Sequence, residues 1–278
     1  MKRLAHMKFM FGLLAFSLVL STAGCKSSDK KQNKQKSQTI KPLLKKAIEK
    51  EVKDVVYPLP TSFELTSMLN RIGADYILTL SNSVENVDKY FTEKSRALNL
   101  GVYSADLSYA STYQRKQETM LFLKASKKLI DNLEITSAYN ETLVSEVEKN
   151  LDNKDHLVKV ITNSFYDTYA FLNKNGKENV SLLVVSGSFI EGLYIATHIS
   201  ENTFSNPEIV QVIFDQKGSL DRLIEILKDH KNDANISGLL SDLSQLKKSY
   251  DSIEESMTKA QLNDITKKVE QLRVKIVQ

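Results

Sequence analysis

The chain has a single cysteine, Cys25, among its 278 residues, and it has no tryptophan. One thiol cannot form a disulfide within the chain, so the core alone must stabilise the fold. After the N-terminal segment the only histidines are His156, His198 and His230, which are far apart in the sequence. We therefore expect neither a Cys/His zinc site nor a catalytic cysteine, and we predict no metal and no cofactor.

Glycine and proline are scarce as well, with nine and four residues, and no proline lies between Pro60 and Pro207. Glycine-rich phosphate loops are missing, as are the H-E-x-x-H and G-x-S-x-G motifs of hydrolases. No segment shows sustained strand-like alternation bounded by turn residues. These absences leave a helical fold without a familiar catalytic motif.

The formal net charge of the chain is +4, but residues 42–278 carry no large excess of positive charge. The first 24 residues carry three of the 38 basic residues, and residues 25–41 carry six more with one acid, Asp29. The rest of the chain therefore holds 29 basic and 33 acidic side chains, a net charge of −4. A nucleic-acid-binding face needs clustered Lys and Arg on the folded part, so we expect no nucleic-acid partner.

What the N-terminus does have is the three-part layout of a secretory signal peptide. Lys2, Arg3 and Lys8 supply positive charge, residues 9–20 form an apolar run, and residues 21–24 are small. The apolar run is too short for a stable membrane span. The next residue is the lone cysteine.

This ending, STAGC, resembles the lipobox of a bacterial lipoprotein precursor, with Thr22 where that family most often has Leu. The resemblance implies that the Cys25 thiol receives diacylglycerol, that the signal peptide of residues 1–24 is removed, and that the new amine is acylated, as with palmitate. Several acyl chains anchor a protein stably, because each buried methylene contributes about 0.8 kcal/mol. Residues 25–41 would then form a disordered basic tether to the membrane.

The body, residues 42–278, resembles uncharacterised all-helical lipoproteins of Bacteroidota in the segments LNLGVYSADLSYASTYQ and GSFIEGLYIATHI. In that phylum the signals for surface export tend to be acidic just after the cysteine, whereas residues 26–31 (KSSDKK) are not acidic. The resemblance implies an anchor in the outer membrane that faces the periplasm. It implies no known activity.

Helical periodicity runs through nearly all of this body, which we interpret as one all-α domain, a multi-helix bundle of about 8–10 helices. One helix is expected to start at Thr61 or Ser62 and to end at Gly73. The others are expected over residues 44–52, 84–99, 102–133 with a break near Gln114, 139–151, 155–173, 178–201, 207–229 and 236–277. Asn175–Gly176 is a predicted turn, and Gly218 is a candidate interruption.

Residues 233–278 carry the clearest pattern. Apolar residues recur at steps of four and three from Leu239 to Met257, and again from Leu262 to Ile276. The phase slips between these two runs, which predicts an amphipathic helical hairpin joined near residues 254–258. Such a seam packs either on the protein's own core or against a partner protein.

The most apolar segment, residues 181–199, holds one carboxylate, Glu191. A charge at the centre of a bilayer is costly, so we interpret the segment as the buried central helix of the bundle and not as a membrane span. Gly187 and Gly192 would let another helix, such as the tyrosine-rich one, approach it closely.

Two polar helix faces are candidates for a ligand pocket. They are formed by Tyr103, Asp106 and Tyr113 on one helix, and by Glu191, Tyr194 and His198 on the apolar helix. A carboxylate buried among apolar residues has a raised pKa unless it is paired, which is a property both of general acids and of structural pairs. Each face is therefore either a polar cluster that satisfies its own groups or part of a pocket.

Together these features predict a lipid-anchored cell-envelope protein that acts as a non-enzymatic binding or scaffold module, with the C-terminal helices as a surface for a protein partner. One alternative is a helical-bundle pocket for a small ligand, built on the two polar faces. The other is an envelope hydrolase with an unfamiliar site. No catalytic residue is assigned.

Overall fold

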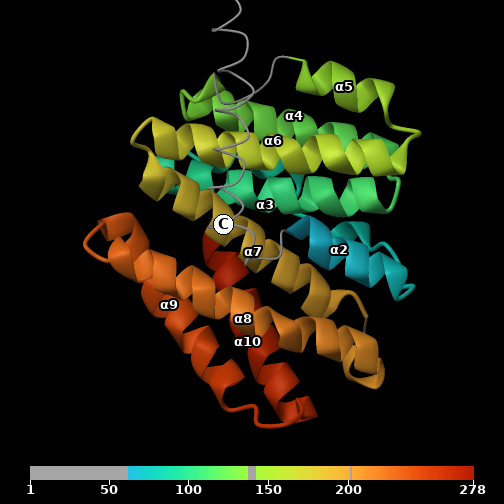
Figure 1. The fold of residues 1–278 in the computed structure, drawn as a ribbon, viewed down its shortest axis with the longest axis vertical. Coiled ribbons are helices and arrows are strands. Elements are labelled where there is room, and N and C mark those ends of the chain that lie inside the picture. Colours follow the sequence, from blue (N-terminus) through green and yellow to red (C-terminus); the bar gives the residue numbers. More distant parts are fainter. Residues whose placement is uncertain (1–61, 137–141, 201) are drawn as a thin grey trace, which may run out of the picture. The chain divides into compact units, whose positions relative to one another are not determined.

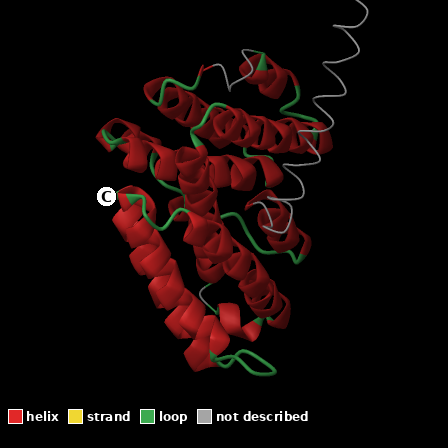
Figure 2. Ribbon diagram, turned by 60° about the vertical axis from the view of Figure 1, so that its left-hand side comes forward, coloured by secondary structure: helices red, strands yellow, loops and turns green. Residues whose placement is uncertain are grey.

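A computed structural model of the chain describes residues 62–136, 142–200 and 202–278 (Figure 1). These described residues belong to one compact unit. Within these described residues every regular element is a helix and no strand occurs (Figure 2). The predicted all-α multi-helix bundle is therefore confirmed. Cys25, the tether and the helix expected over residues 44–52 lie outside the described residues.

The described residues form nine α-helices and three short 3₁₀ helices. The α-helices are α2 (Ser62–Arg71), α3 (Glu93–Thr112), α4 (Lys116–Asn132), α5 (Leu143–Lys149), α6 (Lys154–Lys174), α7 (Glu178–His198), α8 (Pro207–Asp229), α9 (Ala234–Asp251) and α10 (Lys259–Val277). The 3₁₀ helices are η1 (Leu78–Leu80), η2 (Val84–Lys89) and η4 (Thr203–Ser205).

Local signals set most of the helix ends. Thr92 and Thr258 form capping boxes at the starts of α3 and α10, and the Asn206 side chain caps α8 just before its first-turn proline. Gly73 and Gln114 adopt positive φ angles of 83° and 55° after α2 and α3, so both predicted breaks are confirmed. These caps supply partners for backbone groups that a helix end leaves unpaired.

The predicted break between residues 99 and 102 and the predicted interruption at Gly218 are both wrong. Residues 99–102 lie inside one continuous helix, α3, and Gly218 lies inside α8 without interrupting it. A Cβ on Gly101 would lie 2.0 Å from the Val184 carbonyl oxygen, so this glycine serves the close packing of α3 on α7. A glycine within a helix costs only about 1 kcal/mol relative to alanine, which packing of the rest of the helix outweighs.

Helix α7 is the centre of the bundle. It runs between the layer of α3, α4 and α6 and the group of α8, α9 and α10 (Figure 1), and it packs directly on α2, α3, α6, α8 and α10. It is long and apolar enough to cross a membrane by length and composition, but 94% of its apolar window is buried inside the protein. The structure therefore agrees with the interpretation of this segment as a core helix.

The C-terminal hairpin forms as predicted. Helices α9 and α10 pack on each other, and the chain turns between Ser252 and Thr258. The apolar seam is buried, since α9 also packs on α8, and α10 packs on α7. Burial of this seam fixes α10 against the central helix, and this contact positions the polar cluster described next.

Candidate functional site

Tyr103 and Tyr109 on α3 form hydrogen bonds with the irregular segment that joins α2 to α3. The Tyr103 hydroxyl donates a hydrogen bond of 2.8 Å to the Ser83 carbonyl oxygen. The Tyr109 hydroxyl accepts one of 2.8 Å from the Ile77 backbone N–H. A segment with little regular structure needs such partners, because its backbone groups lack a helical ladder.

Asp106 lies on the same face and is fully buried. Its Oδ2 accepts a hydrogen bond of 3.1 Å from the Asn82 backbone N–H. Its Oδ1 is buried and has no hydrogen-bond partner among the described residues. A buried oxygen without a hydrogen-bond partner costs much less free energy in a neutral carboxyl than in a carboxylate.

Glu191 on α7 is also fully buried, and Arg273 on α10 engages both of its oxygens. The Arg273 Nε donates to Glu191 Oε2 at 2.8 Å. The Arg273 Nη2 donates to Glu191 Oε1 and to the Leu80 carbonyl oxygen, both at 2.9 Å. This two-point geometry is the strongest form of an ion pair in proteins. One guanidinium therefore joins α10, α7 and the segment before η2.

The two buried carboxyls share one positive charge, and this decides which of them is ionised. Burial, followed by the nearby Glu191, raises the pKa of Asp106 well above its usual value. Burial also raises the pKa of Glu191, but the Arg273 charge and the two hydrogen bonds from Arg273 oppose this rise. The directions of these shifts favour a neutral Asp106 and an ionised Glu191 whose charge Arg273 neutralises.

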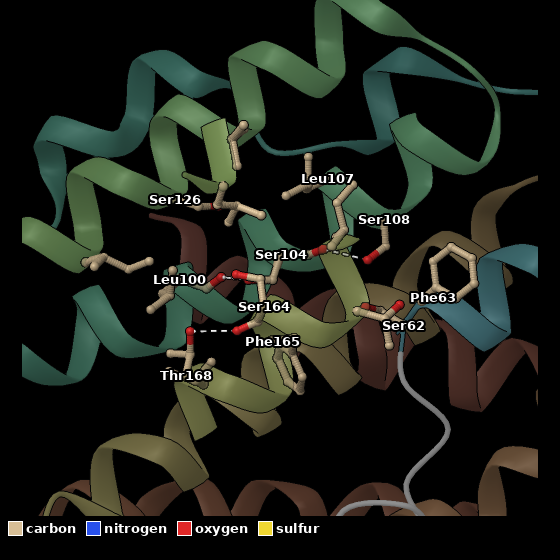
Figure 3. Close-up of a pocket in the computed structure, with 16 residues that line it drawn as sticks. Ser62, Phe63, Leu100, Ser104, Leu107, Ser108, Ser126, Ser164, Phe165 and Thr168 are labelled. Atoms are coloured by element: carbon tan, nitrogen blue, oxygen red, sulfur yellow. Dashed lines mark hydrogen bonds between the residues drawn. The ribbon is translucent and has the colours of Figure 1, made fainter. Parts of the chain in front are cut away.

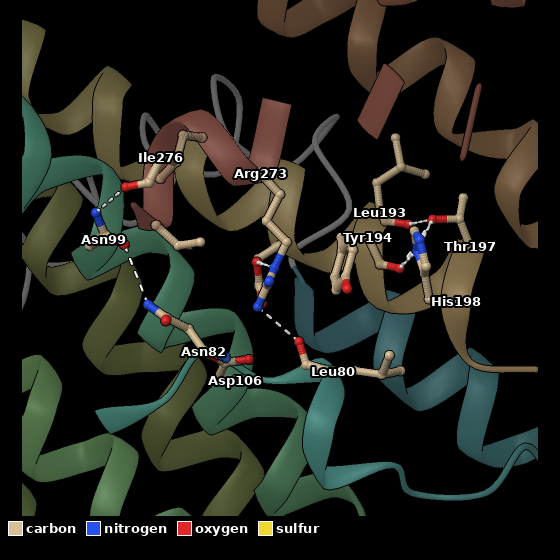
Figure 4. Close-up of polar contacts among 12 residues, drawn as sticks. Leu80, Asn82, Asn99, Asp106, Leu193, Tyr194, Thr197, His198, Arg273 and Ile276 are labelled. Carbon is tan, nitrogen blue, oxygen red and sulfur yellow. Dashed lines mark hydrogen bonds and ion pairs between the residues drawn. The ribbon is translucent and has the colours of Figure 1, made fainter. Parts of the chain in front are cut away.

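Tyr194 and His198 continue the cluster toward the surface on α7. The Arg273 guanidinium lies 4.1 Å from the centre of the Tyr194 ring, and the Tyr194 and His198 ring centres are 4.1 Å apart. Nδ1 of His198 lies 2.9 Å from the Tyr194 carbonyl oxygen and donates a hydrogen bond to it (Figure 4). Burial lowers the pKa of His198, so its imidazole is neutral near pH 7.

The structure therefore brings four of the six predicted pocket residues into one cluster and separates the other two. Asp106, Glu191, Tyr194 and His198 lie around Arg273. Tyr103 anchors the segment before α3. Tyr113 is partly buried, its hydroxyl oxygen is buried without a hydrogen-bond partner among the described residues, and its ring centre lies 5.0 Å from that of Tyr109.

The cluster also contains residues that the sequence analysis missed. Asn99 donates hydrogen bonds to the carbonyl oxygens of Ser95 and of Ile276, at 2.9 and 2.7 Å, and the Asn82 amide lies 3.5 Å from the Asn99 side-chain oxygen. Asn99 thus supplies a partner for a carbonyl in the last turn of α10. Arg273 was missed too, although an arginine within the apolar pattern of the last helix is a natural partner for a buried Glu191.

The ion pair in this cluster joins helices α7 and α10. None of the six predicted residues lines the two hollows found elsewhere, a cavity of about 50 Å³ beside α3, α4 and α6 and a groove of about 300 Å³ at the start of α8. Groups that could hold a metal ion, with three or more His, Cys, Asp or Glu side chains, do not occur among the described residues. The ligand pocket expected at these residues stays a prediction.

Comparison with known proteins adds no function to this geometry. No protein-family model matches the chain, and neither a curated protein nor a solved structure gives a match. The function is therefore inferred from the N-terminal pattern and from the chemistry of the cluster.

Proposed function

We propose that this chain is a lipid-anchored protein of a bacterial cell envelope whose helical body is a non-enzymatic binding or scaffold module. The lipobox-like pattern that ends at Cys25 supports the anchor, and the non-acidic residues after it support an outer membrane location facing the periplasm. The observation that carries the non-enzymatic part is the two-point engagement of Glu191 by Arg273.

A general acid or base must reach the proton that it transfers. Both oxygens of Glu191 are occupied, and the side chain has no exposed surface. Nδ1 of His198 is held by a backbone carbonyl of its own helix, which fixes the ring without adding a substrate contact. This arrangement favours a structural role for the cluster and leaves recognition to other surfaces of the bundle.

The anchor is tested by metabolic labelling with palmitate followed by membrane fractionation. The full chain is expected to incorporate the label and to sediment with membranes, whereas Cys25→Ala loses the label and shifts toward the soluble fraction. Ser27→Ala is the matched control beside the cysteine and should behave like the unaltered chain. A full chain that takes up no label would refute the anchor.

The non-enzymatic role is tested by complementation of a strain that lacks the protein. Glu191→Gln is expected to restore the lost phenotype at any temperature at which limited proteolysis shows the variant to be folded. Glu225→Gln, at a side chain that is 69% exposed, is the matched control. A folded Glu191→Gln protein that fails to complement would support the hydrolase alternative instead.

A further inference from the structure

The larger of the two hollows is a groove of about 300 Å³ between the start of α8 and the turn that joins α9 to α10. The other hollow is the cavity of about 50 Å³ beside α3, α4 and α6 (Figure 3). That cavity has room for a few water molecules, since one water needs about 10–15 Å³. Of the two, only the groove reaches the size of sites that bind larger groups, about 300–1,000 Å³.

The floor of the groove is apolar and partly open to solvent. Helix α8 contributes Pro207, Val210 and Phe214, whose steps of three and four place them along one stripe of the helix. Phe204 from η4 is 38% exposed, and Met257 from the turn also lines the groove. Apolar side chains that gather around a surface hollow, unlike single exposed ones, are typical of a surface that binds a partner.

Acidic side chains border this apolar floor. Glu255 is the only charged residue that lines the groove, and Glu254 precedes it in the same turn. On α8, Glu208 and Asp215 lie about 80–100° around the helix from Pro207, because each residue turns an α-helix by about 100°. All four acidic residues are exposed.

The acidic residues stand on both sides of the apolar stripe. Lys217 lies about 80° from Pro207 in the direction opposite to Glu208 and Asp215. Lys217 pairs with Asp251, which ends α9 just before the turn. The turn with its two glutamates therefore follows one flank of the stripe, and the two acids of α8 follow the other.

These four acids differ from others on the C-terminal helices in their lack of a counter-charge. Five other acids of α8, α9 and α10 each pair with a Lys or Arg of these helices, namely Asp221, Glu225, Asp242, Asp251 and Asp264. Among the described residues no ion pair involves Glu208, Asp215, Glu254 or Glu255, and Lys259, the next lysine after the turn, does not line the groove. Negative charge that is not neutralised attracts a cationic partner and repels anionic lipid headgroups.

We propose that this groove binds a segment of a partner protein in which one or two apolar side chains are flanked by Lys or Arg. The apolar side chains fill the space beside Phe204 and Phe214, and the flanking cations pair with the acids on both sides. A second copy of the chain fits less well, because two such faces would bring their acidic borders together. This inference rests on the proposed role as a binding module, and it does not depend on the anchor.

The test is a fluorescence anisotropy titration of the full chain with the labelled peptide KKLFLKK. Two matched peptides are EELFLEE, which reverses the charge, and KKSSSKK, which removes the apolar centre. Saturable binding is expected for KKLFLKK, and both matched peptides should bind at least about tenfold more weakly, because each lacks one half of the complementarity. Added salt should weaken the binding of KKLFLKK, since it screens exposed charges.

Variants of the chain place the peptide in the groove. Phe204→Ala should weaken the binding of KKLFLKK about tenfold, the usual effect of removing a central aromatic contact. Glu254→Gln together with Glu255→Gln should weaken it about fivefold, because exposed ion pairs are individually weak. The matched controls are Phe91→Ala, at a side chain that is 75% exposed just before α3, and Glu85→Gln, which is exposed in η2. Each control should change the affinity less than twofold.

The proposal is overturned if the full chain binds KKLFLKK no better than EELFLEE, or if the groove variants and the control variants bind it equally. It is also overturned if the full chain is a dimer that Phe204→Ala dissociates, because the groove then holds a second copy. None of these results alters palmitate labelling at Cys25 or complementation by Glu191→Gln, so a failure here is distinguishable from a failure of the proposed function.

Discussion

Replacing Arg273 by methionine should unfold the protein more readily than any other single change in the polar cluster. Methionine keeps much of the length of the side chain but removes the charge from beside Glu191, which is fully buried. Breaking a buried ion pair by removing one partner costs about 3–5 kcal/mol, because the remaining charge is left without compensation. That loss is a large part of the total stability of a typical domain, about 5–15 kcal/mol.

The assay is urea denaturation of the full chain followed by circular dichroism. A loss of this size lowers the urea midpoint by about 1–2 M. The penalty should be larger at pH 8 than at pH 5, because Glu191 without Arg273 escapes part of the cost by taking up a proton. Arg222→Met is the matched control, since the Arg222–Glu225 pair is exposed and contributes at most about 1 kcal/mol.

A double variant decides whether the two charges act as a pair. Arg273→Met together with Glu191→Gln should be more stable than Arg273→Met alone, because no charge is then buried without a partner. The ion-pair explanation is refuted if the two single losses simply add, or if Arg273→Met costs no more than Arg222→Met.

Two further predictions concern the proton on Asp106 and the contact between α3 and α7. The folded protein holds this proton at a pH where the unfolded chain has lost it, so the contribution of Asp106 is complete below about pH 4 and is lost as pH rises through the raised pKa of the folded state. Between pH 5 and 8 the unfolding free energy should fall less steeply in Asp106→Asn than in the unaltered chain; equal slopes would show that Asp106 is ionised when folded. Gly187→Ala places a Cβ 2.0 Å from the Leu98 carbonyl oxygen and should cost about 3 kcal/mol or more, whereas Gly238→Ala meets nothing within 4 Å and should be neutral or slightly stabilising. Thermal unfolding compares these two variants, and similar melting temperatures would contradict the close packing of α3 on α7.

The C-terminal hairpin and the central helix show how much of the fold could be predicted from the sequence. The steps of four and three from Leu239 to Met257 indicate a helix with one apolar face, because this spacing places the side chains along one stripe. The phase slip after Met257 located the turn for the same reason. Residues 181–199 are apolar on every side, which in a soluble bundle places the helix at its centre.

The interruptions were harder to predict. The sequence analysis expected separate helices over residues 84–99 and 102–133, and only the packing of α3 on α7 shows that the missing side chain of Gly101 makes room for another backbone. The sequence alone does not distinguish a glycine that ends a helix from a glycine that lets two helices pack closely. The neighbour that distinguishes them is 83 residues away in the chain, at Val184.

By itself, the sequence determined the all-helical fold, the hairpin and the buried position of Glu191, because each depends on periodic patterns within one or two helices. It also carries the lipobox-like pattern at Cys25, which is local by nature. Only the tertiary structure decided which groups Glu191 meets, because Asp106 and Arg273 are 85 and 82 residues away and their approach depends on how α3 and α10 pack on α7. The same packing leaves the Ser126 and Thr162 hydroxyls without a partner among the described residues, in a cavity whose walls come from six helices.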